Sequence, residues 1–443
     1  MLFERIESQG LAHYSYIIGD MGQAVVIDPR RDCDIYLELA RRAGCRITHI
    51  LETHRNEDYV VGSVELASRT EAAIWHADGQ LDYHYGQPVE DGQTWDIGSY
   101  RLRALATPGH TPGSMSYVLH APNGEPWLVF TGDTLFAGDV GRVDLAGLDL
   151  MPELASALYT SLFEKLLPLG DGVIVCPGHG AGSVCGTAIA DRPWTTIGWE
   201  RVHNPKLQYR DRATFEEHVA QVHPRPPYFR RMERYNLEGA PLLGTLPVPP
   251  ALPAAAFARE AEAGRVLDTR EVVAFGAAHI PTALFIAEAA LPHYLGWFMP
   301  YDVPLFLVTS TGDPTPVTRY SIRLGYDDLA GVLAGGMTAW HMTQRDSAAI
   351  EILPVPAFRR RMATGERAWV LDVRSPAERA AQPGFPDARG IYLPELPDRL
   401  DDIPTDAPII VYCNSGARAM LGASLLARAG FAPLAVVLGT LGA

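Results

Sequence analysis

The chain has 443 residues, of which 47% are apolar and 20% are charged, and this composition is typical of a soluble protein of about three globular domains. Its formal charge of −15 disfavours binding to nucleic acid. No apolar stretch is long enough to span a bilayer, and the N-terminus resembles neither a secretory signal nor a transit peptide. Five scattered cysteines argue against a disulfide framework. We therefore expect a cytoplasmic protein that does not associate with membranes.

Residues 1 to about 185 alternate short apolar runs with polar loops. The runs HYSYIIGD (13–20) and GQAVVIDPR (22–30) predict a strand hairpin, and residues 32–44 predict a helix that ends at Gly44. Four later apolar runs each lead into a loop that carries histidine or aspartate. Polar groups at the ends of buried strands indicate a functional site on a rigid scaffold.

Two segments of different composition follow. Residues 186–240 are more helical and rich in arginine, which we interpret as the solvated face of closing helices. The segment 241–255 carries five prolines and is predicted to be a semi-rigid linker.

The rest of the chain contains an internal repeat. RVLDTREVVAF at 265–275 matches WVLDVRSPAER at 369–379, and three landmark pairs lie 104 positions apart: Asp268 and Asp372, Pro304 and Pro408, and Gly335 and Gly439. A constant offset indicates two copies of one domain of about 100 residues, over 256–345 and 350–443. Each copy alternates strands and helices, so we expect parallel α/β sheets.

Four loop motifs in the first 185 residues resemble the metal motifs of the metallo-β-lactamase fold. They are the segment from His54 to Tyr59, His110 in TPGHTPGS, Asp133 in TGDTLF, and His179 in CPGHG. The resemblance implies an αββα sandwich over residues 1–240. The hydrolases of this family read H-x-H-x-D-H in the first motif, whereas this chain has Asn56 and Tyr59 in place of the second and third histidines.

The surviving residues His54, His110 and Asp133 form a set of two histidines and one carboxylate, which is typical of non-haem Fe(II) oxygenases. The set also resembles the persulfide dioxygenases of this fold, whose GRxD segment is present as Gly141–Asp144. This resemblance implies one Fe(II) per chain that binds a persulfide sulfur and O2 and yields sulfite. We expect Arg142 and Tyr59 to contact substrate, and Cys185 to be structural. Asn56, Asp58 and His179 are expected to form hydrogen bonds around the ligands.

A second candidate site is the segment from Cys413 to Arg418, between an apolar strand and a helix. Backbone N–H groups converge in such a loop and, with Arg418, favour a thiolate. The C-x4-R spacing and LDVRSPAER resemble the rhodaneses, in which the cysteine carries a sulfur as a persulfide. The resemblance implies that Cys413 and Arg418 are catalytic. It also implies a substrate cradle formed by the intervening residues Asn414, Ser415, Gly416 and Ala417.

The first copy has Thr309 at the position of Cys413, so we expect it to be catalytically inactive. Two roles remain open for it: orienting its neighbours, or self-association into a homo-oligomer.

The whole chain resembles the bacterial persulfide dioxygenase–rhodanese fusions, built as a metallo-β-lactamase sandwich followed by two rhodanese-like α/β domains. That resemblance implies oxidation of a low-molecular-weight thiol persulfide, such as glutathione persulfide, by O2, and transfer of sulfur through Cys413 to sulfite, giving thiosulfate. Two alternatives remain open. One is a zinc thioester hydrolase of the glyoxalase II kind fused to a sulfurtransferase, and the other is a sulfur-sensing or carrier protein without enzymatic activity.

Overall fold

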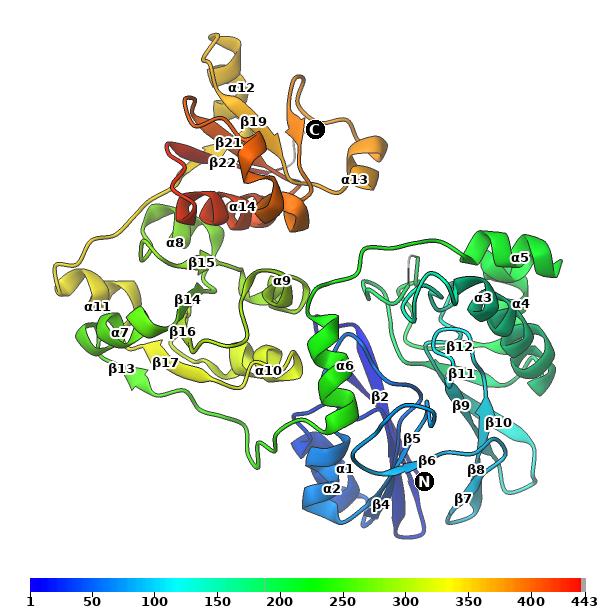
Figure 1. Ribbon diagram of the computed structural model, residues 1–443. Coiled ribbons are helices and arrows are strands. Elements are labelled where there is room, and N and C mark those ends of the chain that lie inside the picture. The colour runs from blue at the N-terminus through cyan, green and yellow to red at the C-terminus, as the bar shows by residue number, and fades with distance from the viewer. Residues whose placement is uncertain (187, 440–443) are drawn as a thin grey trace. The chain divides into compact units, whose positions relative to one another are not determined.

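The computed structural model describes residues 1–186 and 188–439, which form two compact units (Figure 1). The first unit comprises Met1–Leu246 with Ile322–Gly325, and the second comprises Pro247–Ser321 with Tyr326–Ala443. Within the described residues, every helix is too short or too polar to cross a bilayer.

The first unit contains two six-stranded sheets. One sheet has the order β1-β2-β3-β4-β5-β6, with strands β1 (Leu2–Ser8), β2 (His13–Asp20), β3 (Gln23–Ile27), β4 (Arg46–Leu51), β5 (Ala73–His76) and β6 (Gln87–Pro88). The other has the order β12-β11-β10-β9-β8-β7, with strands β7 (Thr94–Ile97), β8 (Tyr100–Ala106), β9 (Met115–His120), β10 (Pro126–Gly132), β11 (Ile174–Pro177) and β12 (Thr195–Thr196). The predicted hairpin is confirmed, because β2 and β3 pair antiparallel.

Helices cover the outer face of each sheet (Figure 1). They are α1 (Asp34–Arg42), α2 (Ser63–Thr70), α3 (Met151–Tyr159), α4 (Ile197–His203) and α5 (Arg212–Val219). Helix α6 (Phe229–Glu238) instead contacts the loop after β4 through Glu233 and Asn236. Helix α3 continues as a π-helical segment, η1 (Thr160–Leu166), and single turns follow at η2 (Leu167–Leu169) and η3 (Lys206–Gln208). The predicted helix at 32–44 corresponds to α1, whose last turn ends two residues before Gly44.

The core of the first unit has three layers of apolar side chains. A central cluster, which includes Tyr16, Trp95, Tyr117 and Phe130, joins the inner faces of both sheets. Two outer clusters pack helices α1 and α2 against the first sheet and helices α3 and α5 against the second. This is the expected αββα sandwich.

The second unit contains two five-stranded sheets, in which every described pairing is parallel. The first has the order β13-β17-β16-β14-β15, with β13 (Ala251–Leu252), β14 (Arg265–Asp268), β15 (Leu284–Phe285), β16 (Leu305–Val308) and β17 (Leu329–Leu333). The second has the order β18-β22-β21-β19-β20, with β18 (Glu351–Pro354), β19 (Trp369–Asp372), β20 (Arg389–Gly390), β21 (Ile409–Tyr412) and β22 (Leu434–Leu438).

The helices of this unit also repeat. The first copy carries α7 (Ala254–Glu260), η4 (Ala261–Ala263), α8 (Val272–Ala277), η5 (Glu288–Ala290), α9 (Leu291–Phe298), α10 (Thr315–Arg323) and α11 (Gly336–Met342). The second copy carries α12 (Val355–Ala363), α13 (Pro376–Ala381), η6 (Leu393–Asp402) and α14 (Ala417–Arg428). The predicted repeat is confirmed, because β14 and β19 begin 104 residues apart, as do β16 and β21.

The predicted linker at 241–255 needs correction at its C-terminal end. Ala251 and Leu252 form β13, which pairs with β17, and α7 begins at Ala254. Proline is tolerated there because β13 is a short edge strand and Pro253 directly precedes the helix.

The two copies contact each other within this unit. Helix α14 of the second copy packs beside β15 of the first, where the Phe285 N–H donates a hydrogen bond of 3.2 Å to the buried Ser424 hydroxyl.

Candidate metal centre and thiol cradle

The four metal-motif residues of the first unit lie in loops that follow strands of both sheets. His54 follows β4, His110 follows β8, Asp133 follows β10 and His179 follows β11. All four side chains are buried. The sandwich therefore brings together residues that are 125 positions apart in the chain.

A chain of hydrogen bonds orients His54. The Thr53 hydroxyl donates to the Asp28 carboxylate over 2.7 Å, and its oxygen lies 2.9 Å from His54 Nδ1. Because the hydroxyl proton is used on Asp28, His54 Nδ1–H is the donor in the second contact, and Nε2 keeps its lone pair. Burial raises the pKa of Asp28 to about 6.

His110 is oriented in the same way by the backbone. Its Nδ1 donates to the carbonyl of Arg142 over 2.9 Å, which leaves Nε2 as the free acceptor. Nε2 of His54 and Nε2 of His110 lie 3.8 Å and 3.6 Å from Asp133 Oδ2. Two imidazoles and a carboxylate thus converge as the motif predicts.

Gly132 allows this approach. It has φ +49°, and a Cβ atom there would lie 2.4 Å from the Thr53 hydroxyl oxygen. Any larger residue before Asp133 would displace the threonine that orients His54.

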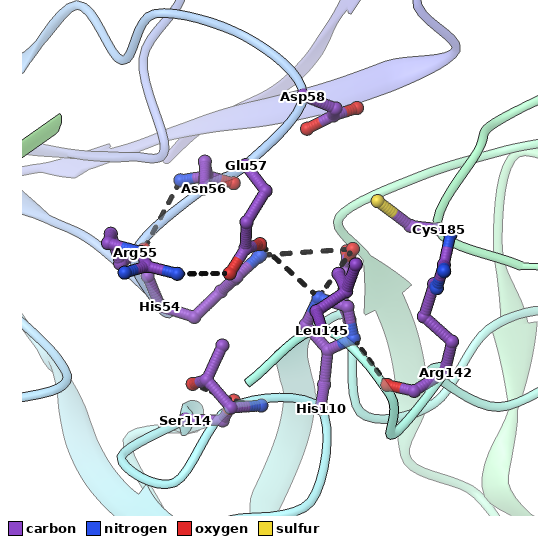
Figure 2. Close-up of polar contacts among 12 residues, drawn as sticks. His54, Arg55, Asn56, Glu57, Asp58, His110, Ser114, Arg142, Leu145 and Cys185 are labelled. Atoms are coloured by element: carbon purple, nitrogen blue, oxygen red, sulfur yellow. Dashed lines mark hydrogen bonds and ion pairs between the residues drawn. The ribbon is translucent and has the colours of Figure 1, made fainter. Parts of the chain in front are cut away.

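Two further buried side chains that could bind a metal, Glu57 and Cys185, lie near the same three residues. Glu57 Oε2 lies 3.7 Å from His110 Nε2. The sulfur of Cys185 lies within 4.8 Å of ligand atoms of His110 and Asp133. Cys185, which we expected to be structural, therefore borders the site (Figure 2). The sequence feature that could have indicated this location is the short distance along the chain from His179 to Cys185.

His179 is held between two carboxylates. Its Nδ1 lies 2.7 Å from Asp133 Oδ1, and its Nε2 lies 3.0 Å from Asp58 Oδ2. Although burial favours the neutral ring, these two carboxylates raise the pKa of His179 well above its ordinary value.

Asn56 and Tyr59 lie beside the metal motif in different ways. The Asn56 amide donates to the His54 carbonyl over 3.3 Å, and Figure 2 shows it directed away from His110. Tyr59 is fully buried and stacks on His13 with ring centroids 3.9 Å apart.

The expected substrate contact of Arg142 stays a prediction, and the contacts of its side chain give it no support. Its five N–H donors bind the two oxygens of Asp144 and the carbonyls of Val184, His223 and Pro224. The side chain is buried as well. A guanidinium with every donor engaged braces the loop that holds His110, and it has no donor left for a substrate carboxylate.

The chemistry of the donors fits a divalent cation. His54 Nε2, His110 Nε2, Asp133 Oδ2 and Glu57 Oε2 are buried and have no hydrogen-bond partner among the described residues. Unpaired buried carboxylates are costly, and an ion bound between them offsets that cost. His54, His110 and Asp133 are therefore well placed to hold a metal.

The second candidate site lies at the end of β21, in the second unit. Cys413 is buried, and its sulfur accepts a hydrogen bond of 3.1 Å from the Gly416 N–H. Gly416 has φ +102° and directly precedes α14. A Cβ atom at this position would clash with the Leu438 side chain, so a larger residue would not fit without a shift. The loop from Asn414 to Ala417, expected to form a substrate cradle, joins β21 to α14, and Ser415 in it is exposed.

Arg418 is fixed by a residue that the sequence analysis did not single out. Its guanidinium donates two hydrogen bonds of 2.7 Å to Glu378, which also accepts from the Asn414 amide over 3.0 Å. Glu378 closes a capping box with Ser375 at the start of α13. The S-x-x-E pattern was the available signal.

The first copy has a longer loop, with six residues from Thr309 to the start of α10 where the second has four from Cys413 to α14, but one contact is shared. Thr309 follows β16 as Cys413 follows β21, and its hydroxyl oxygen accepts from the Gly312 N–H over 3.1 Å. Arg270 pairs with Asp268 as Arg374 pairs with Asp372.

Comparison with known proteins agrees with this architecture. The family model described as the metallo-beta-lactamase superfamily matches residues 9–179, and the model of the rhodanese-like domain matches twice, at 253–343 and 355–441. The bovine mitochondrial protein named persulfide dioxygenase ETHE1 is 32% identical over 205 residues, which cover 44% of this chain and 71% of that protein. The chain belongs to the metallo-β-lactamase superfamily, among the relatives of persulfide dioxygenases, with tandem rhodanese-like domains.

Two other relatives of this superfamily member are informative. A crystal structure titled metallo-beta-lactamase from Staphylococcus aureus is 30% identical, with a TM-score of 0.66, and the match covers 75% of this chain and 98% of that one. A Haemophilus influenzae protein named hydroxyacylglutathione hydrolase GloC is 27% identical over 214 residues, which cover 44% of this chain and 91% of that protein. The S. aureus match covers more of this chain than the first unit contains.

Proposed function

We propose that the protein is an Fe(II)- and O2-dependent persulfide dioxygenase that is also a sulfurtransferase. The observation that carries this proposal is the arrangement at Asp133. Its Oδ2 faces the free nitrogens of His54 and His110, whereas its Oδ1 is taken by His179. His179 lies between Asp133 and Asp58, and we expect a single ion, held by His54, His110 and Asp133.

In the first reaction, RSSH + O2 + H2O gives RSH + SO3²⁻ + 2 H⁺. Iron held by His54, His110 and Asp133 would supply adjacent positions for the terminal sulfur and for O2. The protein residues orient these ligands: Thr53 holds His54, and the Arg142 carbonyl holds His110. Arg142 itself fixes the loop through Asp144.

In the second reaction, Cys413 takes the sulfane sulfur of RSSH, giving RSH and an enzyme persulfide. Sulfite then attacks the outer sulfur, the S–S bond to Cys413 breaks, and the products are thiosulfate and the free thiol. The Gly416 N–H at 3.1 Å from the sulfur supports this role, since a donor there stabilises negative charge on sulfur. Glutathione persulfide or a similar thiol persulfide in the cytoplasm would serve as substrate for both reactions.

The test is metal analysis of anaerobically purified protein, combined with O2 uptake on addition of glutathione persulfide. We expect about one iron per chain and O2 consumption. His110→Ala should remove both. His120→Ala, which changes a histidine bonded to the Gly124 carbonyl in the β9–β10 hairpin, should leave both intact.

A zinc thioester hydrolase is the second candidate, because the GloC relative is covered over most of its length. Two zinc ions per chain, with thioesterase activity and no O2 uptake, would establish that candidate and refute the dioxygenase.

A further inference from the structure

Glu57 is a buried carboxylate that neither the family motif nor the ligand set described above uses. It lies in the loop after β4, three residues beyond His54, and 1% of its surface is exposed. Figure 2 shows its side chain directed toward His110. Its Oε1 accepts a hydrogen bond of 3.1 Å from Arg55, which leaves Oε2 free at 3.7 Å from His110 Nε2.

Glu57 shares a pattern with the three metal-motif residues. Each of the four side chains uses one polar atom to bind the protein: His54 through Thr53, His110 through the Arg142 carbonyl, Asp133 through His179, and Glu57 through Arg55. Each leaves its other polar atom buried without a hydrogen-bond partner in the described part of the chain. One atom anchored and one atom free is the arrangement expected of metal ligands.

Glu57 Oε2 lies about as close to His110 Nε2 as Asp133 Oδ2 does. His110 Nε2 lies 3.6 Å from Asp133 Oδ2 and 3.7 Å from Glu57 Oε2. Nitrogen and oxygen ligands about 2.1 Å from one ion stand roughly 3–3.5 Å apart, so a small inward movement would complete the coordination. The donor atoms of His54, Glu57 and His110 all lie within 4.8 Å of one another.

We propose that Glu57 is a fourth protein ligand of this metal, in place of the imidazole that the motif loses at Asn56; this inference rests on the proposed metal centre. The Asn56 side-chain amide donates to the His54 carbonyl, and the Asn56 backbone carbonyl accepts from the Asn236 amide. Asn56 is thereby turned aside, and the carboxylate of the next residue faces the ligands instead.

A second carboxylate changes the chemistry of the centre. Two neutral imidazoles and two carboxylates would balance the charge of a divalent ion, and such a mixed nitrogen and oxygen set suits Fe(II). Four protein ligands leave two positions on a six-coordinate ion, which is the number that a persulfide sulfur and O2 require.

The test compares iron affinity in the full-length protein with Glu57→Gln, measured anaerobically by competition with a chromogenic chelator. We expect the variant to bind Fe(II) more than about 100-fold more weakly, since loss of a hydrogen-bonding partner of a ligand alone costs about 10- to 100-fold. Glu153→Gln, at an exposed glutamate of α3, is the matched control and should bind as the parent does.

The visible absorption of the Co(II)-loaded protein is the second readout. It should change in position and intensity in Glu57→Gln, because the coordination sphere loses a donor, and a residue that acts only through Arg55 or His110 would leave it unchanged. The metal-free variant should melt at or above the temperature of the metal-free parent, because an unpaired buried carboxylate is removed, and its stabilisation by added metal should shrink. Glu57→Asp, which keeps the charge but reaches less far, should lie between Gln and the parent.

Unchanged affinity and an unchanged Co(II) spectrum in Glu57→Gln would overturn this assignment while leaving the dioxygenase intact. A parent protein that holds zinc and consumes no O2 would refute the dioxygenase, and the Co(II) spectra would still decide the role of Glu57.

Discussion

The Thr309 hydroxyl stands in the first rhodanese-like copy where the Cys413 sulfur stands in the second. Each accepts a hydrogen bond of 3.1 Å from the N–H three residues later, at Gly312 and Gly416. The first copy has therefore kept the turn after its central strand and lost the atom that carries sulfur.

Thr309→Ala tests this equivalence. We expect O2 uptake and sulfur transfer close to the parent values, and a loss of about 1 kcal/mol of local stability from the missing hydrogen bond. Sulfur transfer is measured as thiosulfate formed from glutathione persulfide and sulfite. A large loss of transfer from this change alone would contradict a catalytically inactive first copy.

Cys413→Ser should separate the two proposed reactions. The metal-motif residues belong to the first unit and Cys413 to the second, so O2 uptake with added persulfide should persist. A serine hydroxyl is hardly ionised near neutral pH, so the product should shift from thiosulfate toward free sulfite. Both anions are quantified by thiol-reactive labelling and chromatography.

Two other results of that experiment would be instructive. Thiosulfate at the parent level would mean that another thiol carries the sulfur, and Cys185, beside His110 and Asp133, is the first to examine. Loss of O2 uptake would mean that Cys413 feeds the metal centre and that the reactions are coupled.

Arg142→Met tests whether this residue braces the loop. Removing one partner of a buried ion pair leaves the Asp144 carboxylate uncompensated, and we expect about 3–5 kcal/mol of destabilisation. The double variant Arg142→Met/Asp144→Asn should recover part of that loss, measured by chemical denaturation. If the Arg142→Met variant is as stable as the parent but has a raised KM for persulfide, the prediction that Arg142 contacts substrate would be supported instead.

The ion pair between Glu378 and Arg418 should make α14 sensitive to acid. Hydrogen bonds from Arg418 lower the pKa of Glu378 from 4.5 to about 2. A carboxylate with a lowered pKa in the folded state stabilises it fully above pH 4.5 and loses that effect as the pH falls toward 2.

Glu378→Gln should therefore lower the opening free energy of α14 by about 1 kcal/mol at pH 7, a modest value because the pair is partly exposed. The difference should shrink below pH 4.5, as measured by hydrogen exchange of α14 peptides. Glu125→Gln, an exposed glutamate elsewhere, should show no such difference. An equal difference at pH 3 and pH 7 would contradict the assignment.

Local patterns in the sequence predicted much of this architecture. Apolar runs ending in Gly, His and Asp located the strand ends that bear His54, His110 and Asp133, and the 104-residue offset located Thr309 opposite Cys413. These features depend on residues close together in the chain or on internal repetition.

What the sequence did not reveal depends on contacts between distant segments. The Arg142 guanidinium donates hydrogen bonds to backbone carbonyls about 40 and 80 residues further along the chain. No local sequence pattern shows that its N–H groups have these partners. Glu57 occupies a variable position of the motif, and only the side-chain directions show that it faces His110 while Asn56 does not. The role of β13 was hidden because prolines surround it.

The hydrogen bond from Phe285 to Ser424 suggests a structural role for the first rhodanese-like copy, which has threonine in place of the cysteine. Helix α14, which begins at the Cys413 loop, contacts the backbone of the first copy near its middle, where Ser424 accepts a hydrogen bond from the Phe285 N–H. Deleting that copy would uncover an apolar flank of this helix and strip Ser424 of its donor, so the sulfur-carrying loop would lose the support beneath it. The first copy therefore supports the main helix of the second copy from outside.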